Sequence, residues 1–502
     1  MSYAELHRRS GRLAKALRGL GVQRGDRVAL CLPKSPPGVV TIFAALKAGA
    51  AYVPVDPTQP ATRQAAILAD SEPAVLVADA IRFAQIAASP AGLPAGLRAV
   101  ILVGADGVAP ASSPPVHRFG DCTDGERDDA PEPLDPADPA DPDDLAILLY
   151  TSGSTGLPKG VKITLRNLHT FIAWASAEMD LRATDVFANH AAFHFDLSTF
   201  DLFAAVRAGA GIWIASEGEM QSPLALGGAI DEHGITVWYS VPSILTLMLA
   251  ANVFSDGAAA RLRYLLFAGE VFPIKHLRAL RERLPQTALY NLYGPTETNV
   301  CTYFRVGEIA PERATPVPIG RPITGARAWI ADERGEPAEV GATGELLIEG
   351  PCVTPGYWRR SGYDNEPNHR RNVHATGDLV SLEDGEYVYR GRKDRMVKVS
   401  GFRVELGEIE AALARHPAIA EAAVIAVATD SGVRLMAFCA PPQGGNPPSL
   451  IEVKQHCGRH LPRYMIPHTL TVRDALPHNA NGKIDLVVLA ALAREQAGVS
   501  AT

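Results

Sequence analysis

The chain has 502 residues, of which 47% are apolar, so it can bury more than one hydrophobic core and at least two domains are expected. A formal net charge of −7 gives no general attraction to nucleic acid or to an anionic membrane. The six cysteines are scattered and form no CxxC pair, which argues against a disulfide framework or a structural zinc site and fits a reducing cytoplasm. The N-terminus has no apolar signal core, and no run of residues approaches the length of a membrane span.

The first part of the chain alternates between helical and extended patterns. Ser2 and Glu5 have the spacing of a capping box, ahead of a helical leucine pattern that ends at Gly21. Strands are expected at residues 27–32, 74–77 and 100–103, with a helix at 37–50 that runs into a turn and strand at 47–57. This alternation predicts a parallel α/β sheet. Residues 106–144, rich in Pro, Ala and Asp, cannot form a core and are predicted to be an exposed loop.

Residues 150–161 read YTSGSTGLPKGV and directly follow an apolar strand at 145–149. Hydroxyl groups and flexible backbone amides at a strand end can cradle a polyanion such as phosphate. The spacing departs from a P-loop NTPase, because Leu157 and Pro158 stand between Gly156 and Lys159. A flexible linker is the alternative, but a linker needs neither the strand nor the lysine. The segment resembles the phosphate loop of the adenylate-forming (ANL) ligases, the superfamily of acyl-CoA synthetases, luciferases and nonribosomal peptide synthetase adenylation domains.

The segment HFDLSTFDLF at 194–203 contains Asp196, which could simply cap the helix that follows it. The resemblance implies another role, since its FDxS pattern marks the carboxylate that pairs with a substrate's amino group. Acyl-CoA ligases generally lack this carboxylate. The resemblance therefore narrows to domains that activate amino acids.

The segment NLYGPTET at 291–298 could be only a Gly-Pro turn after a strand. The resemblance implies that Tyr293 lies against adenine and that Glu297, with Thr155, holds Mg²⁺. HATGDL at 374–379 places Asp378 at a turn, where an Asx-turn is the plain alternative to a contact with two ribose hydroxyls. Residues 344–358 are expected to be a structural strand and turn.

Residues 391–410 resemble the hinge of these enzymes, with Asp394 as the pivot. The expected domains are residues 1–393, which bind ATP and the amino acid, and a lid at 394–502. The lid pattern predicts helices at 408–416 and 450–460 and strands at 422–427 and 435–440. Lys483 follows Asn481-Gly482, a strong hairpin signal, so an exposed lysine at a turn is one reading. The resemblance implies that Lys483 is the catalytic lysine.

The resemblance also assigns the nucleotide site and the thiolation face. It implies that the face turned toward a carrier's thiol includes Lys398 and Gly401. It implies that the following residues bind ATP: Thr151, Ser152, Gly153, Ser154, Thr155, Lys159, Gly269, Glu270, Asn291, Tyr293, Gly294, Thr296, Asp378, Tyr389 and Arg392.

The amino acid pocket implied by the resemblance is bulky and apolar apart from two charged anchors, Asp196 and Lys483, and one hydroxyl. Its other members are Leu197, Phe200, Tyr239, Leu266, Ala268, Leu292, Val300 and Cys301. It has no second carboxylate or base to pair a charged side chain, and burying one unpaired would be costly, so a small apolar amino acid is implied. This pocket resembles that of free-standing L-prolyl-AMP ligases of pyrrole pathways. Valine, 2-aminobutyrate and alanine stay open, because one methylene discriminates by only about 1 to 3 kcal/mol.

The resemblance implies a two-step reaction. The amino acid carboxylate attacks the α-phosphorus of ATP to give aminoacyl-AMP and pyrophosphate, and the aminoacyl group then passes to a phosphopantetheine thiol. No carrier-protein Ser motif follows Lys483 and no HHxxxDG precedes Ser2, so the carrier is expected in trans, and a monomer is expected. The competing classes are an acyl-CoA or aryl-CoA ligase of the same fold and an inactive adenylate-binding scaffold.

The implied fold class is α/β. The expectation is a large N-terminal domain with parallel sheets flanked by helices and a β-barrel-like subdomain, followed by a small mobile α+β domain. The start at Ser2 departs from the family, which usually has a further segment ahead of this helix.

Overall fold

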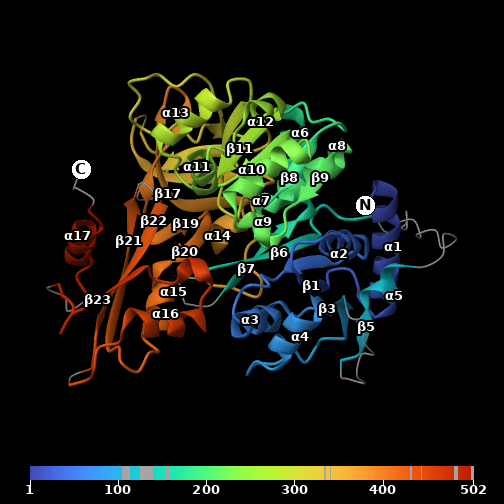
Figure 1. Cartoon of the computed structure of the whole chain (residues 1–502), viewed down its shortest axis with the longest axis horizontal. Helices are drawn as coiled ribbons and strands as arrows, with labels where there is room; N and C mark the ends of the chain where they lie inside the picture. The colour runs from blue at the N-terminus through green and yellow to red at the C-terminus, as the bar shows by residue number, and fades with distance from the viewer. Residues whose placement is uncertain are drawn as a thin grey trace.

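The computed structural model describes residues 1–104, 114–124, 139–153, 158–332, 335–339, 341–429, 432–442, 444–479 and 484–498. Within these residues, two seven-stranded sheets and a four-stranded sheet form a large N-terminal domain, and two small sheets belong to a C-terminal domain (Figure 1). This is the mixed α/β architecture that the sequence predicts. None of the described helices combines the length and apolarity needed to cross a membrane.

The first sheet has the order β5-β4-β3-β1-β2-β6-β7, and only the β6–β7 pair is antiparallel. Its strands are β1 (Arg27–Cys31), β2 (Ala51–Pro54), β3 (Val75–Asp79), β4 (Ala99–Val103), β5 (Val116–Arg118), β6 (Leu145–Thr151) and β7 (Lys159–Thr164). Its helices are α1 (Tyr3–Gly19), α2 (Pro36–Lys47), α3 (Ala61–Ser71), α4 (Ala80–Ala87) and α5 (Phe119–Thr123). Ser2 caps α1 by accepting a hydrogen bond from the Glu5 N–H at 3.2 Å.

One expectation about this sheet is wrong. Residues 106–144 were expected to form a single exposed loop, but β5 and α5 lie inside that range. The edge strand β5 pairs in parallel with β4, and Phe119 at the start of α5 is buried in the core. Within this acidic stretch, Val116–Arg118 pair with β4 and Phe119 packs into the core, and these contacts order the segment. Residues 105–113 and 125–138 lie outside the described residues.

The second sheet has the order β14-β13-β12-β11-β10-β8-β9, parallel from β9 to β12 and antiparallel beyond. Its strands are β8 (Val186–Asn189), β9 (Gly211–Ile214), β10 (Val237–Ser240), β11 (Tyr264–Ala268), β12 (Ala288–Tyr293), β13 (Thr302–Val306) and β14 (Arg321–Pro322). Its helices are α6 (Leu165–Glu178), α7 (Leu197–Thr199), α8 (Ala205–Ala208), α9 (Glu217–Met220), α10 (Pro223–Glu232), α11 (Pro242–Ala250), α12 (Asp256–Arg261) and α13 (Ile274–Arg283). The two sheets share one core, in which Val28 and Ile147 of the first sheet join Phe187 and Leu266 of the second.

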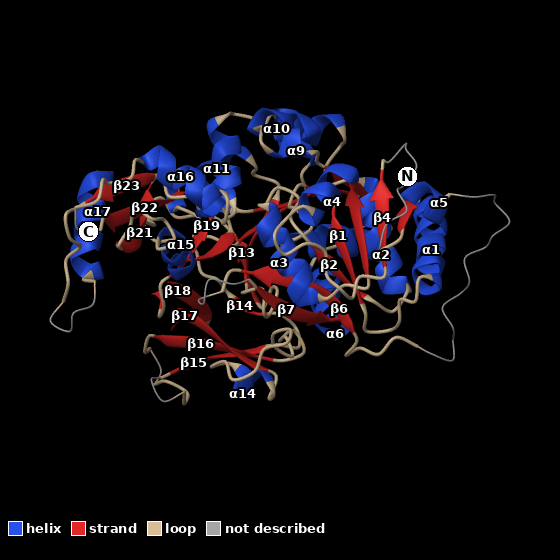
Figure 2. Cartoon of the chain, turned by 90° about the horizontal axis from the view of Figure 1, so that it is seen from below, coloured by secondary structure: helices blue, strands red, loops and turns tan. Residues whose placement is uncertain are grey.

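The third sheet is antiparallel, with the order β15-β16-β17-β18, and corresponds to the subdomain expected to be barrel-like (Figure 2). Its strands are β15 (Arg327–Ala331), β16 (Gly344–Glu349), β17 (Val373–Glu383) and β18 (Glu386–Arg392), with the short α14 (Glu366–His369) beside β17. Asp378 was expected at a turn, and this expectation is wrong. It lies within β17, next to a register shift at Leu379/Val380, and is buried.

The C-terminal domain has two cores of its own, one beneath α15 and α16 and one beneath α17. Its elements are β19 (Met396–Val399), β20 (Phe402–Glu405), α15 (Leu406–Leu413), β21 (Glu421–Thr429), β22 (Gly432–Ala440), α16 (Leu450–Gly458), the 3₁₀ turn η2 (Arg463–Met465), β23 (Thr469–Val472) and α17 (Leu486–Ala497). The helices and strands that the sequence predicts there are confirmed within a few residues at their ends.

Candidate active site

The candidate site lies where the segments that follow parallel strands of both sheets converge. The loops after β1, β2, β8 and β10 line one cavity, and the loops after β11 and β12 carry Gly269, Glu270 and Gly294. Ligands of open α/β sheets bind outside the carboxyl ends of the strands, because these loops are free of sheet packing. The C-terminal domain closes this region from the other side with β19 and β20.

Asp196 lies at this junction, partly exposed, immediately before α7. Its Oδ2 accepts a hydrogen bond from Thr296 Oγ1 at 2.9 Å, and it makes no side-chain capping hydrogen bond to α7. Burial raises the pKa of the Asp196 carboxyl, while the Thr296 hydroxyl and the Lys398 ammonium act in the opposite direction. The carboxylate therefore does not serve as the cap of α7. A cationic partner would offset the free-energy cost of its burial.

The apolar residues of the expected amino acid pocket are all buried. Phe200, Tyr239, Leu266 and other members belong to the core shared by the two sheets, and Cys301 lies in the neighbouring cluster with Tyr293. The rings of Phe200 and Tyr239 meet edge to face, with centroids 5.6 Å apart. Phe200 begins a π-helical turn, Phe200–Ala204, directly after α7, and such turns are frequent at functional sites. These residues lie buried in two neighbouring cores, and their role as the amino acid pocket stays a prediction.

Glu297 is the most heavily engaged carboxylate of the site. Its Oε1 accepts a hydrogen bond from Tyr357 Oη at 2.6 Å, and it forms ion pairs with Arg403 at 3.1 Å and Lys159 at 3.5 Å. Burial alone would raise the pKa of Glu297, but Arg403 and Lys159 outweigh it and hold that pKa well below its usual range. Glu297 is therefore an ionised carboxylate, the form that a divalent cation requires.

Asp378 connects residues that were expected to bind the nucleotide to Asp394, the expected hinge. It accepts hydrogen bonds from Arg392 at 2.6 Å and from the Tyr293 hydroxyl. Arg392 also forms a bidentate pair with Asp394, at 2.6 and 2.7 Å. Tyr389 packs against the same cluster as Tyr293. The structure brings these five residues together, although they come from β12, β17, β18 and the segment after β18.

The expected phosphate loop is described only in part, because Ser154 and Thr155 lie outside the described residues. Ser152 Oγ donates a hydrogen bond to the backbone oxygen of Arg403 at 2.8 Å. The Thr151 hydroxyl is buried and has no hydrogen-bond partner among the described residues, so it can serve a ligand. Asn291 is instead used structurally, because its side chain donates to Pro318 O at 2.7 Å.

The two domains also meet at Glu270 and Gly401. Glu270 accepts hydrogen bonds from the Gly401 N–H at 2.8 Å and from the Ser243 N–H at 2.9 Å. Gly401 has a φ of 79°, and a Cβ there would lie 2.4 Å from Val241 Cγ1, so only glycine fits this approach. The expected residues Gly269, Glu270 and Gly401 therefore come together at the domain interface.

Lys483 lies outside the described residues. The residues around it do not approach the site: His478 pairs with Ile484 in a β-bridge, and α17 follows at Leu486. In both views α17 lies at the outer edge of the C-terminal domain, on the far side from α3 and the first sheet (Figures 1 and 2). In this arrangement the C-terminal domain presents β19 and β20 to the site.

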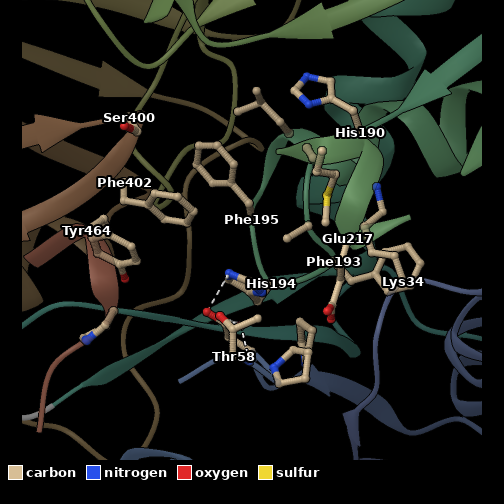
Figure 3. A pocket seen from close by; sticks show the side chains of 18 of the residues that line it. Lys34, Thr58, His190, Phe193, His194, Phe195, Glu217, Ser400, Phe402 and Tyr464 are labelled. Carbon is tan, nitrogen blue, oxygen red and sulfur yellow. Dashed lines mark hydrogen bonds and ion pairs between the residues drawn. The ribbon is translucent and has the colours of Figure 1, made fainter. Parts of the chain in front are cut away.

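A cavity of about 300 Å³ leads into the site along the domain interface (Figure 3). Its walls include Thr58, His194 and Phe195 of the N-terminal domain and Phe402 and Tyr464 of the C-terminal domain. The rings of Phe402 and Tyr464 are stacked, with centroids 4.1 Å apart, and Phe402 also stacks on Phe195 at 5.1 Å. The surface of the lining is mainly apolar, so the cavity suits a largely uncharged ligand.

Sequence reasoning missed several of these residues. Arg403 lies within the hinge-like stretch but carried no assigned role, and Tyr357 was placed in a structural turn. Phe402 and Tyr464 had no signal beyond aromatic side chains near predicted element ends. Their contacts all cross large sequence separations, which local patterns do not report.

The fold and site define an enzyme class with a nucleotide-binding α/β domain and a small C-terminal domain placed over it. The chain belongs to the AMP-binding enzyme family: the family's profile matches residues 1–358, and the profile of the AMP-binding enzyme C-terminal domain matches residues 408–483.

Relatives support this membership over nearly the whole chain. The chain is 51% identical over 496 residues to an L-proline--[L-prolyl-carrier protein] ligase of Streptomyces coelicolor, covering 97% of this chain and 91% of the relative. It is 41% identical over 491 residues to a ligase of the same name from Pseudomonas fluorescens, covering 98% and 94%. Among solved structures, the Vibrio cholerae adenylation domain AlmE in complex with glycyl-adenosine-5'-phosphate matches with a TM-score of 0.83 at 24% identity, covering 99% of this chain and 93% of that chain.

Proposed function

We propose that the protein activates L-proline with ATP to prolyl-AMP and pyrophosphate and then transfers the prolyl group to the phosphopantetheine thiol of a separate carrier protein. The observation that carries this proposal is the carboxylate of Asp196, which lies directly before α7 among buried apolar side chains such as Leu197 and Phe200. The two ligases at 51% and 41% identity, both named for proline and its carrier protein, support the same substrate. The free and mostly buried cysteines fit work in a reducing cytoplasm.

The amino acid would bind with its ammonium against Asp196 and its ring against the buried apolar wall. Proline suits this arrangement, because its secondary ammonium satisfies the carboxylate and its ring leaves no polar group in the pocket. Valine, 2-aminobutyrate and alanine present the same charge with a different volume. The discrimination among them comes from shape and amounts to about 1 to 3 kcal/mol per methylene.

The adenylation step joins two anions, so cationic groups must offset their repulsion. Residues 151–155 and Lys159 would hold the phosphates, Tyr293 and Tyr389 the adenosine, and Asp378 the ribose. The ionised Glu297 with Thr155 would hold Mg²⁺, whose charge lowers the repulsion among the phosphates. Lys483 would contact the substrate carboxylate and the α-phosphate once the C-terminal domain has turned about Asp394.

The transfer step fits the arrangement described here. Lys398 and Gly401 lie on the face of the C-terminal domain that is turned toward Asp196 and Glu270. The 300 Å³ cavity provides a path along which a pantetheine arm could bring its thiol to the aminoacyl carbonyl. The thiol would lose its proton and its sulfur would bond to the carbonyl carbon, as the bond from that carbon to the AMP oxygen breaks and AMP leaves.

The test is ATP–pyrophosphate exchange with L-proline against valine, 2-aminobutyrate, alanine, a charged and a large aromatic amino acid. Proline is expected to give the highest rate. Lys483→Ala is expected to lose most of the exchange while ATP binding, measured by calorimetry, stays close to wild type. Strong exchange with a charged or aromatic amino acid would refute the pocket assignment. Unchanged exchange in Lys483→Ala would remove Lys483 from the mechanism.

A further inference from the structure

His194 is a titratable side chain on the wall of the cavity. It stands two residues before Asp196 in the chain, and it lines the cavity together with Phe195 and Thr58 (Figure 3). Leu197, which directly follows Asp196, lines the same cavity. A ligand that moves along the cavity toward Asp196 therefore passes the imidazole ring of His194.

The carboxylate of Asp56, on the segment after β2, faces this ring. His194 Nε2 lies 3.5 Å from Asp56 Oδ2, and Asp56 is buried. The other carboxylate oxygen, Oδ1, accepts hydrogen bonds from the Thr58 N–H at 2.8 Å and from the Thr58 hydroxyl at 2.7 Å. These two donors hold the carboxylate in place beside the ring. A positive charge on the imidazole would therefore be stabilised by an ion pair with Asp56.

The contact with Asp56 leaves one ring nitrogen of His194 available to a ligand. In the neutral ring the proton belongs on Nε2, because a lone pair on that nitrogen would face the carboxylate oxygen. Nδ1 then carries the lone pair, and no described residue forms a hydrogen bond with it. Nδ1 can thus accept a proton from a group that lies in the cavity.

The C-terminal domain completes the cavity beside His194. The ring of Phe402, on β20, lies nearly parallel to that of His194, with centroids 6.1 Å apart, and Tyr464 stacks on the same Phe402 ring. Both aromatic residues line the cavity. The passage that His194 borders is therefore enclosed while the C-terminal domain presents β19 and β20 to the site, which is the arrangement that fits the transfer step.

The transfer step needs a group that removes a proton. The nucleophile is the thiolate, and an alkyl thiol, with a pKa of about 8.5, is mostly protonated at neutral pH. A histidine beside the nucleophile commonly takes this proton, and a carboxylate on its other ring nitrogen orients the ring and stabilises its charged form. His194 and Asp56 have this arrangement on the path proposed for the pantetheine arm.

We propose that His194 is the general base of the prolyl transfer and that Asp56 is its positioning residue. This rests on the proposed transfer function. His194 Nδ1 takes the thiol proton as the sulfur bonds to the carbonyl carbon of prolyl-AMP. The bond from that carbon to the AMP oxygen breaks, and its electron pair leaves with AMP. The proton on the imidazolium then passes to water, which restores the neutral ring.

The experiment measures the prolyl thioester formed from prolyl-AMP in a single turnover, by mass spectrometry. The acceptors are free pantetheine, ethanethiol and the more acidic 2,2,2-trifluoroethanethiol, at a pH where the last is mainly thiolate. In His194→Gln, transfer to pantetheine and to ethanethiol is expected to fall at least about a hundredfold, as for loss of a general base. Transfer to trifluoroethanethiol is expected to fall by less than about tenfold, because it has already lost its proton. Asp56→Asn should show the same pattern with a smaller loss.

The matched control is His169→Gln, the same replacement at an exposed histidine of α6. It is expected to transfer the prolyl group to all three thiols at the wild-type rate. The proposal is overturned if His194→Gln matches His169→Gln with ethanethiol. It is also overturned if transfer to ethanethiol and to trifluoroethanethiol falls equally, because His194 would then only shape the passage. Absence of proline exchange in the wild-type enzyme would instead refute the proposed function.

Discussion

The Thr296 hydroxyl favours the ionised form of Asp196 and so opposes the rise in its pKa that burial causes. Thr296→Val removes the 2.9 Å hydrogen bond that favours the carboxylate, so burial is expected to raise the pKa of Asp196 further. A protonated Asp196 cannot pair with the substrate ammonium. We therefore expect the KM for proline to increase on acidification in both proteins, with the increase beginning at a higher pH in Thr296→Val. Pyrophosphate exchange across the acidic and neutral range measures it.

Thr296→Ser is the control, because it keeps the hydroxyl and should keep the wild-type pH profile. If the profiles of Thr296→Val and wild type coincide, Asp196 is not the group that titrates. A uniform increase of KM at every pH would indicate a loss of fit in the pocket instead.

At the scale of single residues, short sequence motifs were enough to single out side chains such as Asp196 and Glu297. Asp196 and Glu297 both lie at the junction, because each motif follows a strand end and the strand ends of a parallel sheet converge. The sequence did not reveal that Arg403 pairs with Glu297, because the two residues are 106 positions apart in the chain. The position of Arg403 depends on how the C-terminal domain lies against the N-terminal domain, and no local pattern carries that information.

At the scale of elements, the turn after β12 is determined by a close approach of two backbone segments. A Cβ on Gly294 would lie 1.5 Å from Asn299 O, which is backbone and cannot move aside. Gly294→Ala is therefore expected to lower the melting temperature by several degrees and to weaken binding at neighbouring Thr296 and Glu297. Thermal unfolding followed by circular dichroism measures this loss.

Gly307→Ala is the matched control, because a Cβ on Gly307 meets nothing within 4 Å. It should unfold within about a degree of wild type, as surface substitutions usually change stability by less than about 0.5 kcal/mol. Equal melting temperatures for the two variants would show that the turn can relax and that Gly294 is not required by packing.

Two secondary-structure elements were not predicted correctly from the sequence pattern. The acidic composition of residues 106–144 concealed β5, because a three-residue edge strand is stabilised by its neighbour β4 and not by its own pattern. The Gly-Asp pair at Asp378 reads as a turn, but Gly377, with a φ of 75°, adopts its turn-like conformation inside β17. Both cases are tertiary contacts overriding local propensity.

For the whole molecule, the sequence predicts the fold class and the order of the domains but not their relative orientation. The segment expected to act as a hinge would serve any orientation of the C-terminal domain, so its sequence favours none. In the described arrangement Arg403 and Gly401 lie at the site, and the neighbours of Lys483 lie away from it. The contacts that select this arrangement are found only in the folded molecule.

The ion pair between Arg63 of α3 and Glu408 of α15 is one of these contacts. Both side chains are buried at the domain interface. Removing one partner of a buried pair leaves the other charge uncompensated, at a cost of about 3 to 5 kcal/mol. This cost applies only while the domains stay in the described arrangement, because rotation about Asp394 would return Glu408 to water. Loss of the pair should therefore favour the other orientation.

We expect Arg63→Met to slow prolyl transfer to the holo-carrier by at least about tenfold, because 1.4 kcal/mol of lost preference is a factor of ten in population. Pyrophosphate exchange, which would need the rotated domain, should be unchanged or faster. The charge-exchanged protein, Arg63→Glu with Glu408→Arg, should recover part of the transfer rate, since an ion pair can form again. An equal loss of both half-reactions in Arg63→Met would mean that the pair stabilises the fold and does not select the orientation.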